Sequence, residues 1–212
     1  MSMYYNFIAV EGNIGSGKTT LANKLSKDLN ARLILEEFSD NPFLPKFYLN
    51  PDKYAFPLEL FFMAERYRQF KKEQEQDLFM PFTISDYSFI KSYLFAQNNL
   101  NSDELQLFNR LFDIVSSSIK KPDLVVYLYS DIIRLKKNIR MRGREYESNI
   151  SDEYLQSIQE RYLDFLNKQK DFPVLMLNVT KVDFNKDLVV YNSIKELILS
   201  KYTSGVHYFE LP

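Results

Sequence analysis

Short apolar runs alternate with helical patterns along this chain. Aliphatic and β-branched residues gather in runs short enough to predict buried strands, at residues 7–10, 32–35, 81–86, 123–128 and 173–178. Between and after these runs, apolar residues recur every three or four positions. That spacing predicts helices over residues 21–29, 58–76, 88–99, 102–120, 131–141, 151–171 and 186–202. Strands that alternate with helices predict an α/β fold, with a five-stranded parallel sheet flanked by helices.

Two segments follow neither pattern. Residues 38–50 contain two prolines and predict a loop, and residues 203–212 predict a plain chain terminus. The terminal segment holds the only histidine, His207, for which we expect no catalytic role. Ser102 precedes two acidic residues and predicts the N-cap of its helix.

Composition fits one globular domain over residues 1–212, since 45% of the residues are hydrophobic and 26% are charged. No apolar run approaches the roughly 20 residues that a membrane-spanning helix needs. The first residues lack the basic segment and cleavage site of a secretory signal, so we expect a cytoplasmic protein. The net charge of −1 argues against binding to a nucleic-acid polymer or an anionic membrane. Zero cysteines exclude disulfides and thiolate metal sites.

A phosphate-binding loop follows the first predicted strand. Its pattern is Gly12-x-x-x-x-Gly17-Lys18-Thr19, and a predicted helix comes directly after it. Backbone N–H groups of such a loop surround phosphates, the lysine adds a mobile cation and the threonine hydroxyl holds Mg²⁺. We therefore expect a nucleotide to contact Gly12, Asn13, Ile14, Gly15, Ser16, Gly17, Lys18, Thr19 and Thr20.

Carboxylates follow two other predicted strands. Glu36 and Glu37 end the second, and Asp86 ends the third. Ligands of parallel α/β sheets bind beyond the carboxyl ends of the strands, so these acids are candidates for chemistry. An acid after an apolar strand also fits the group that orders Mg²⁺ in nucleotide enzymes, which suits Asp86. Two solvated loop acids remain the alternative for Glu36 and Glu37.

Three arginines lie around a glycine at the end of the fifth predicted helix, over residues 131–141. Arg140, Arg142 and Arg144 stand at alternate positions and cannot share one helix face. They predict a lid over residues 140–151 that closes on phosphates. A basic helix end, favourable to the helix dipole, is the alternative.

From about residue 5 to residue 202 the chain resembles the deoxynucleoside kinase family. The resemblance rests on the phosphate loop, residues 36–43, Asp86-Tyr87-Ser88 and residues 142–147. It implies a P-loop kinase fold, a homodimer, and small-molecule nucleosides and nucleotides as partners. It also implies ATP-dependent phosphorylation of the 5′-hydroxyl of a deoxyribonucleoside in nucleotide salvage, with Mg²⁺ as cofactor.

The same resemblance implies roles for individual residues. Glu36 would be the general base, Lys18, Arg142 and Arg144 would be catalytic cations, and Arg140 would contact ATP. In the acceptor site, Tyr48 and Glu147 would hold the sugar 3′-hydroxyl and Phe95 would stack on the base. Thr19 and Asp86 would serve the metal.

Three positions depart from the family pattern. Glu37 replaces a proline, and Tyr87 replaces an arginine, which removes a positive charge that a lid arginine would have to supply. Glu59 replaces a glutamine that pairs with the base; its simplest alternative role is a solvent-facing residue. An ionised carboxylate can only accept hydrogen bonds, and guanine offers two adjacent donors, whereas adenine and cytosine pair a donor with an acceptor. Glu59 therefore favours deoxyguanosine.

Two other functions stay open at this point. A nucleoside monophosphate kinase of the thymidylate type shares the fold, but it must grip an acceptor phosphate, which Tyr87, Glu36 and Glu37 do not suit. A nucleotide-binding module without transfer activity would explain the missing arginine.

Overall fold

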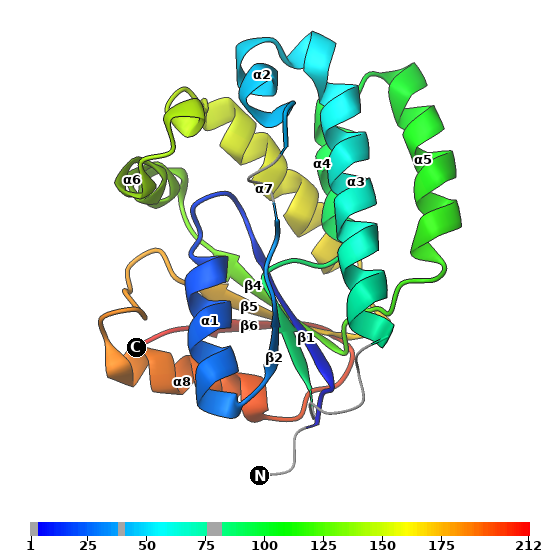
Figure 1. Cartoon of the computed structure of the whole chain (residues 1–212). Helices are drawn as coiled ribbons and strands as arrows, with labels where there is room; N and C mark the ends of the chain where they lie inside the picture. The colour runs from blue at the N-terminus through cyan, green and yellow to red at the C-terminus, as the bar shows by residue number, and fades with distance from the viewer. Residues whose placement is uncertain (1–3, 38–40, 76–81) are drawn as a thin grey trace.

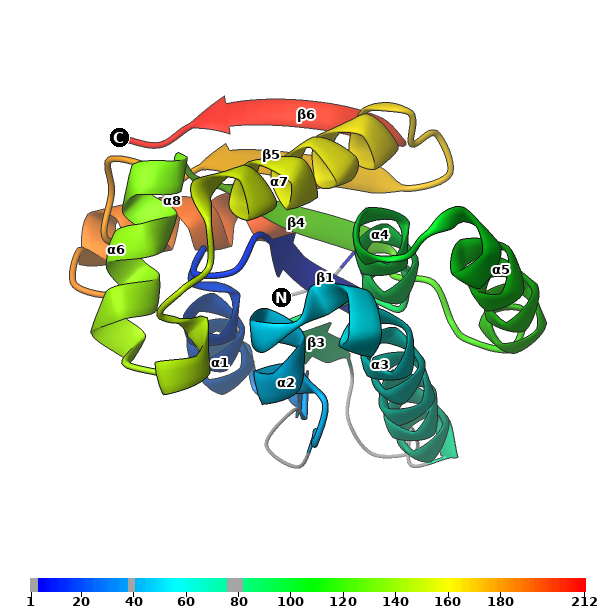
Figure 2. The same ribbon diagram turned by 90° about the horizontal axis from the view of Figure 1, so that it is seen from above.

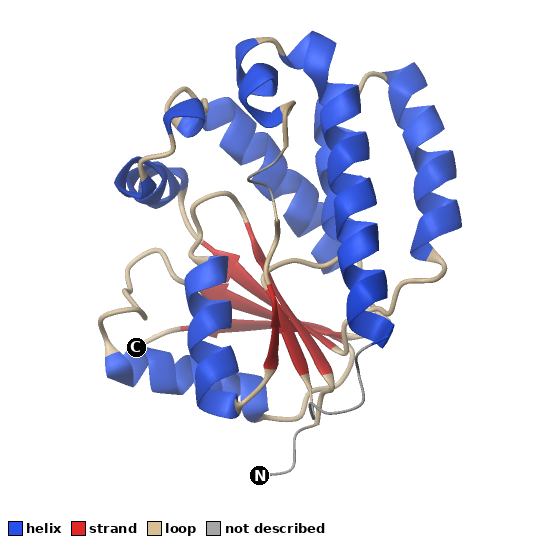
Figure 3. Ribbon diagram, in the orientation of Figure 1, coloured by secondary structure: helices blue, strands red, loops and turns tan. Residues whose placement is uncertain are grey.

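A six-stranded parallel sheet forms the centre of the computed structural model, which describes residues 4–37, 41–75 and 82–212 (Figures 1 and 3). The strand order is β2-β3-β1-β4-β5-β6. The strands are β1 (Phe7–Gly12), β2 (Arg32–Ile34), β3 (Thr83–Ser85), β4 (Leu124–Tyr129), β5 (Pro173–Asn178) and β6 (Gly205–Glu210). Every residue of β1 is buried, which explains its continuous apolar run and places the phosphate loop at the middle of the sheet.

Helices cover both faces of the sheet. They are α1 (Lys18–Leu29), α2 (Leu44–Leu49), α3 (Pro51–Glu75), α4 (Ile90–Asn99), α5 (Ser102–Ser116), α6 (Ile132–Arg142), α7 (Asp152–Asn167) and α8 (Leu188–Leu199), with a 3₁₀ turn, η1 (Glu145–Glu147). Seen from above, α7 lies on one side of β1 and α2 and α3 lie on the other, with α4 between α7 and α3 and with α5 outside α3 and α4 (Figure 2). Among these residues, none of the helices combines the length and apolar character that crossing a membrane requires.

Alternating side chains of the central strand point into different cores. Ile8 and Val10 join the core beneath α1 and α8, whereas Ala9 joins the core beneath α4 and α7. This is the period of two expected for a strand covered on both faces. The double covering fixes the carboxyl end of β1, and with it the phosphate loop, between the two helical layers.

The prediction of five strands was wrong by one. Residues 205–210 form β6, which pairs in parallel with β5 along its whole length, including Leu175 opposite His207. The sequence predicts a terminus there because an edge strand has a neighbouring strand on one side only and is less covered than a central strand. Its residues are mostly half-exposed or exposed, so they carry no strong apolar pattern.

The predicted loop over residues 38–50 was also partly wrong, because residues 44–49 form α2. Pro45 lies in the first turn of that helix, where a missing N–H costs nothing. The N-cap of α5 is Asn101 rather than Ser102, and its side chain accepts the N–H groups of Asp103 and Glu104. Parts of three predicted elements lie outside the described residues: 38–40 of the loop, 76 of a helix and 81 of a strand.

Candidate active site

The phosphate loop joins β1 to α1 through glycines in the left-handed region. Gly12 has a φ of 149° and Gly15 a φ of 84°. A Cβ atom at Gly12 would lie 2.6 Å from Ser16 Oγ, and one at Gly15 would lie 2.7 Å from the carbonyl oxygen of Leu135. Neither position has room for a side chain, so the backbone itself forms the surface that a phosphate would meet.

Side chains from distant helices hold the loop in place. Asn13, which is buried, donates from Nδ2 to the carbonyl of Leu155 on α7 at 2.7 Å. Asn138 on α6 donates to the carbonyl of Gly15 at 2.8 Å. Lys18 folds back and donates from Nζ to the carbonyl of Asn13 at 2.7 Å. Burial, and then the charge of Lys91, lowers the pKa of Lys18 to about 8, so an anion would be a better partner for it than the carbonyl.

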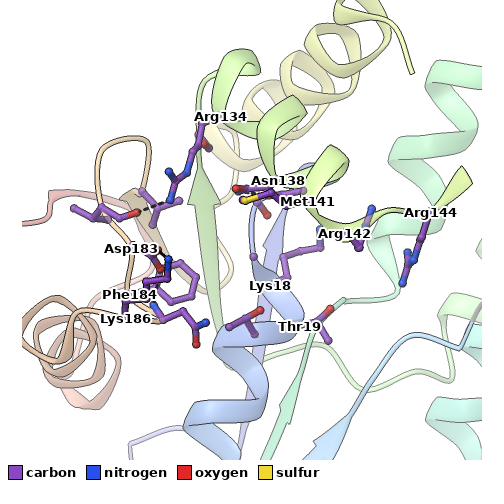
Figure 4. A pocket seen from close by; sticks show the side chains of 18 residues that line it. Lys18, Thr19, Arg134, Asn138, Met141, Arg142, Arg144, Asp183, Phe184 and Lys186 are labelled. Atoms are coloured by element: carbon purple, nitrogen blue, oxygen red, sulfur yellow. Dashed lines mark hydrogen bonds and ion pairs between the residues drawn. The ribbon is translucent and has the colours of Figure 1, made fainter. Parts of the chain in front are cut away.

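A broad cavity opens beside this loop and leaves about 530 Å³ accessible to the centres of water molecules; it is called the donor cavity below. Figure 4 shows Arg142 and Arg144 on the side of Lys18 and Thr19, with Asp183, Phe184 and Lys186 on the opposite side. The lining includes all the predicted residues from Gly15 to Thr20, together with Arg134 and Asn138.

Arg140 does not line this cavity. It lies on α6 with its side chain exposed, two residues before the end of the helix. Arg134, one and a half turns earlier on the same helix, lines the cavity instead and donates from Nη2 to the carbonyl of Val182 at 3.2 Å. The contact between Arg140 and ATP therefore stays a prediction without geometric support.

Thr19 and Asp86 meet at the edge of the loop. Thr19 Oγ1 donates to Asp86 Oδ2 at 2.5 Å, and the backbone N–H of Glu36 donates to Asp86 Oδ1 at 2.8 Å. A hydroxyl and a carboxylate fit Mg²⁺, which takes few protein oxygens and completes its shell with water and phosphate. Bound there, Mg²⁺ would neutralise phosphate charge. Within the described ranges, no three acidic, histidine or cysteine side chains cluster as a metal cage.

Glu36 lies between two buried cations. Arg66 on α3 donates to Glu36 Oε1 from Nε at 2.9 Å and from Nη2 at 2.6 Å, and Lys91 on α4 donates to Oε2 at 2.5 Å. Burial alone would raise the pKa of Glu36, but the charges of Lys91 and Arg66 outweigh it and hold the pKa at about 2. Glu37 is different: its side chain is 63% exposed and pairs with Arg68. The solvated-acid alternative thus describes Glu37 and not Glu36.

A second, tighter cavity adjoins the first and is called the acceptor cavity below. About 110 Å³ of it is accessible to the centres of water molecules. It shares Lys18, Thr19, Arg142 and Arg144 with the donor cavity. All the predicted substrate-binding residues line it: Glu36, Tyr48, Glu59, Phe95 and Glu147. The structure therefore brings together, from five segments of chain, residues that the sequence places up to 111 positions apart.

Glu59 is buried in the wall of the acceptor cavity. It is 1% exposed, so it is not the solvent-facing residue of the simplest alternative. Its Oε1 accepts from Asn99 Nδ2 at 2.7 Å, whereas Oε2 has no hydrogen-bond partner among the described residues. Burial raises the pKa of Glu59 to about 7, against the opposing charge of Arg66. A buried oxygen without a partner is costly unless a ligand supplies a donor.

The predicted lid begins at the end of α6. Gly143, at a φ of 70°, ends the helix after Arg142. Arg142 forms an ion pair with buried Glu147, and Arg144 Nη1 lies 3.2 Å from Glu147 Oε1. Tyr146 stacks on Tyr48 of α2 with ring centroids 6.2 Å apart. These contacts join the lid to the acceptor side; whether it opens stays a prediction.

Sequence reasoning missed Arg66, Lys91 and Asn99, each of which lines the acceptor cavity. Helical spacing could have found them. Glu59 and Arg66 are seven residues apart on α3, and Phe95 lies midway between Lys91 and Asn99 on α4 at intervals of four. Such intervals put side chains on one helix face. Choosing the face that points inward, however, requires the packing of α3 against α4.

Comparisons with known proteins give a consistent result. A family model described as deoxynucleoside kinase matches residues 8–203. A deoxyguanosine kinase of Bacillus subtilis (strain 168) is 32% identical over 204 residues, covering 91% of this chain and 98% of the relative. A deoxyadenosine kinase of Dictyostelium discoideum is 33% identical over 174 residues, covering 81% and 71%. A solved structure of deoxyadenosine kinase from M. mycoides with bound dATP shares the fold, with a TM-score of 0.74, 24% identity and coverage of 89% and 99%.

Proposed function

The chain belongs to the deoxynucleoside kinase family, and we propose that it transfers the γ-phosphoryl group of ATP to the 5′-hydroxyl of a deoxyribonucleoside. The product would be the 5′-monophosphate, as in nucleotide salvage. The observation that carries this proposal is the junction of the two cavities. Lys18 and Thr19 belong to both, and Glu36 and Asp86 line the acceptor cavity with them, so a donor phosphate and an acceptor hydroxyl would meet beside these four residues.

Glu36 is suited to receive the acceptor hydroxyl. Ionised and held by Arg66, it would accept a hydrogen bond from the 5′-hydroxyl and take its proton as transfer proceeds. The new bond forms between the 5′-oxygen and the γ-phosphorus. The bond from the γ-phosphorus to the oxygen that bridges it to the β-phosphorus breaks, and that oxygen leaves with ADP. Lys18 would stabilise the negative charge on the donor phosphates.

A monophosphate acceptor suits this cavity less well. Glu36, Glu59 and Glu147 line it, and the first and last are already paired with arginines. A phosphorylated acceptor would bring further negative charge beside these carboxylates, whereas a nucleoside hydroxyl brings none. The uncharged acceptor is therefore favoured over the substrate of a thymidylate-type kinase.

Deoxyguanosine is the acceptor that Glu59 favours. Its partnerless Oε2 would accept from one guanine donor, and Oε1, already bonded to Asn99, could accept from the second. A deprotonated Glu59 would face a ring acceptor in adenine or cytosine and repel it. The relatives include both deoxyguanosine and deoxyadenosine kinases, so this preference rests on Glu59 alone.

One set of assays tests both the proposed kinase activity and the proposed preference for deoxyguanosine. The wild type is assayed with ATP and each of the four deoxynucleosides, and Glu59→Gln is assayed alongside. We expect turnover with at least one deoxynucleoside, and a drop of about tenfold in the kcat/KM ratio of deoxyguanosine to deoxyadenosine in Glu59→Gln. Glu65→Gln, the same change on the outer side of α3, should keep the wild-type ratio. Turnover of no deoxynucleoside refutes the activity, and an unchanged ratio refutes only the base preference.

A further inference from the structure

The position of Lys91 is unusual for a lysine in two respects. It is the second residue of α4, and a cation in the first turn of a helix is disfavoured by the helix dipole. Its side chain is 9% exposed, although lysine is rarely buried without full compensation. Within the described ranges its ammonium group has one hydrogen-bond acceptor, Glu36 Oε2, and the ring of Phe95 with its centroid 5.5 Å away.

Arg66 already satisfies the other oxygen of Glu36. It donates twice to Oε1 and once to Ser92 Oγ at 2.8 Å, so its guanidinium is held on three nitrogens. One carboxylate therefore faces two buried cations, of which one is fixed and the other is held at a single point. The ammonium group of Lys91 carries three N–H donors, so a phosphate oxygen could accept from those that Glu36 does not use.

The ammonium group of Lys91 lies beside the phosphate loop. Lys91 and Lys18 line the same acceptor cavity, together with Thr19 and Asp86. Tyr87, where the sequence pattern leads one to expect a positive charge, is fully buried and donates its hydroxyl to Gln69, so it supplies none. The lid arginines Arg142 and Arg144 are both paired with Glu147.

We propose that Lys91 is a catalytic residue that contacts the transferred phosphoryl group from the acceptor side. This inference rests on the proposed kinase function. Arg66 keeps Glu36 oriented, and Lys91 neutralises charge on the phosphoryl oxygens while the 5′-oxygen attacks and ADP leaves. The hydroxyl proton passes to Glu36. Lys18 would thus contact the transferred phosphoryl group from the donor side, and Lys91 would contact it from the acceptor side.

The test replaces Lys91 by glutamine, which keeps a donor for Glu36 and removes the charge. We expect kcat to fall about 10²-fold, with the KM of the nucleoside and the dissociation constant of ATP within threefold of wild type. Lys91→Arg should recover at least a tenth of the wild-type kcat. Lys168→Gln, the same change at an exposed lysine paired with Asp164, is the matched control and should leave kcat and KM unchanged.

A binding measurement separates this role from a structural one. Aluminium fluoride with ADP and deoxynucleoside mimics the transferring phosphoryl group, and it should tighten ADP binding to the wild type. In Lys91→Gln, we expect aluminium fluoride to tighten ADP binding at least tenfold less than it does in the wild type. The affinity of the variant for ADP alone should be normal. If Lys91→Gln fails to fold, Lys91→Met is judged by the same two criteria.

Four outcomes would overturn the proposal. A kcat within twofold of wild type means that the charge of Lys91 does not act in transfer, and so does an unchanged gain from aluminium fluoride. A higher nucleoside KM with normal kcat means that Lys91 only shapes the cavity. A wild type that phosphorylates no deoxynucleoside refutes the proposed function, and this inference with it, whereas an active wild type with a normal variant refutes Lys91 alone.

Discussion

The donor cavity and the acceptor cavity share a wall but are built from different parts of the chain. The donor side contains one run of consecutive backbone, the phosphate loop from Gly15 to Thr20, to which α6 and residues 179–186 add side chains. The acceptor side is made of single side chains from α2, α3, α4, α7 and η1, including buried carboxylates and rings. Backbone N–H groups suit phosphates, which are the same in every nucleotide. Side chains suit a base, which must be distinguished from other bases.

Removing the cation of the donor side should have the largest effect. Lys18→Ala should lower kcat by roughly 10³-fold or more, because a charge aimed at the transferring phosphate is lost. Deoxynucleoside binding should persist because Glu59 and Phe95 are unchanged. The rise in melting temperature on addition of the nucleoside measures this binding. Equal loss of nucleoside binding would show that the two cavities cannot be separated in this way.

Removing the base of the acceptor side should cost less. Glu36→Ala should lower kcat roughly 10²-fold or more while ATP still binds, which is the usual scale for a positioned general base. Rates and ATP titrations measure the two effects separately. Glu37→Gln, a change at the exposed neighbour, should stay within about threefold of wild type. A fully active Glu36→Ala would place the base elsewhere.

Glu59 should make stability depend on pH. Its pKa of about 7 in the fold lies above the ordinary 4.5, so the folded state holds a proton that the unfolded state releases. This contribution is complete below about pH 4.5 and is lost as the pH rises through about 7. Between pH 5 and 8, the unfolding free energy of the wild type should fall by about 2 kcal/mol relative to Glu59→Gln.

Urea unfolding at several pH values measures this difference. Glu65→Gln lies on the same helix with its carboxylate in an exposed pair with Arg68, and it should follow the wild type. If the curves of wild type and Glu59→Gln run parallel, the carboxylate of Glu59 is charged throughout that range. The acceptor cavity would then be as polar as the donor cavity.

The smallest effect is expected at the lid. A Cβ atom at Gly143 would meet no described atom within 4 Å, so Gly143→Ala should cost only the strain of a positive φ, about 1 kcal/mol. At Gly12 the added carbon would also lie 2.8 Å from the carbonyl of Leu128, so Gly12→Ala should cost more and should weaken ATP binding. Thermal unfolding of the two variants compares them. Equal costs would mean that the phosphate loop can shift to make room.

The sequence predicted the donor side better because a contiguous motif carries it. Gly12 to Thr19 are contiguous, and the glycines at the positive-φ positions, Gly12, Gly15 and Gly17, are visible in the sequence itself. The roles of Glu36 and Glu37 could not be separated in this way, since the difference depends on Arg66 and Lys91, which arrive on two other helices. Central strands were predicted because burial on both faces makes them apolar, and β6 was missed because it is an edge.

The phosphate loop depends on other parts of the fold, although its sequence is contiguous. Asn13 is tied to the carbonyl of Leu155, and Asn138 to that of Gly15, so two helices outside the motif complete its shape. Grafting the motif alone into another sheet would leave a buried amide and a carbonyl unsatisfied. An engineer who wishes to exchange donor specificity in this chain would have to move segments of α6 and α7 along with the loop. Because Tyr154 beside Leu155 lines the acceptor cavity, such an exchange would also alter the nucleoside site.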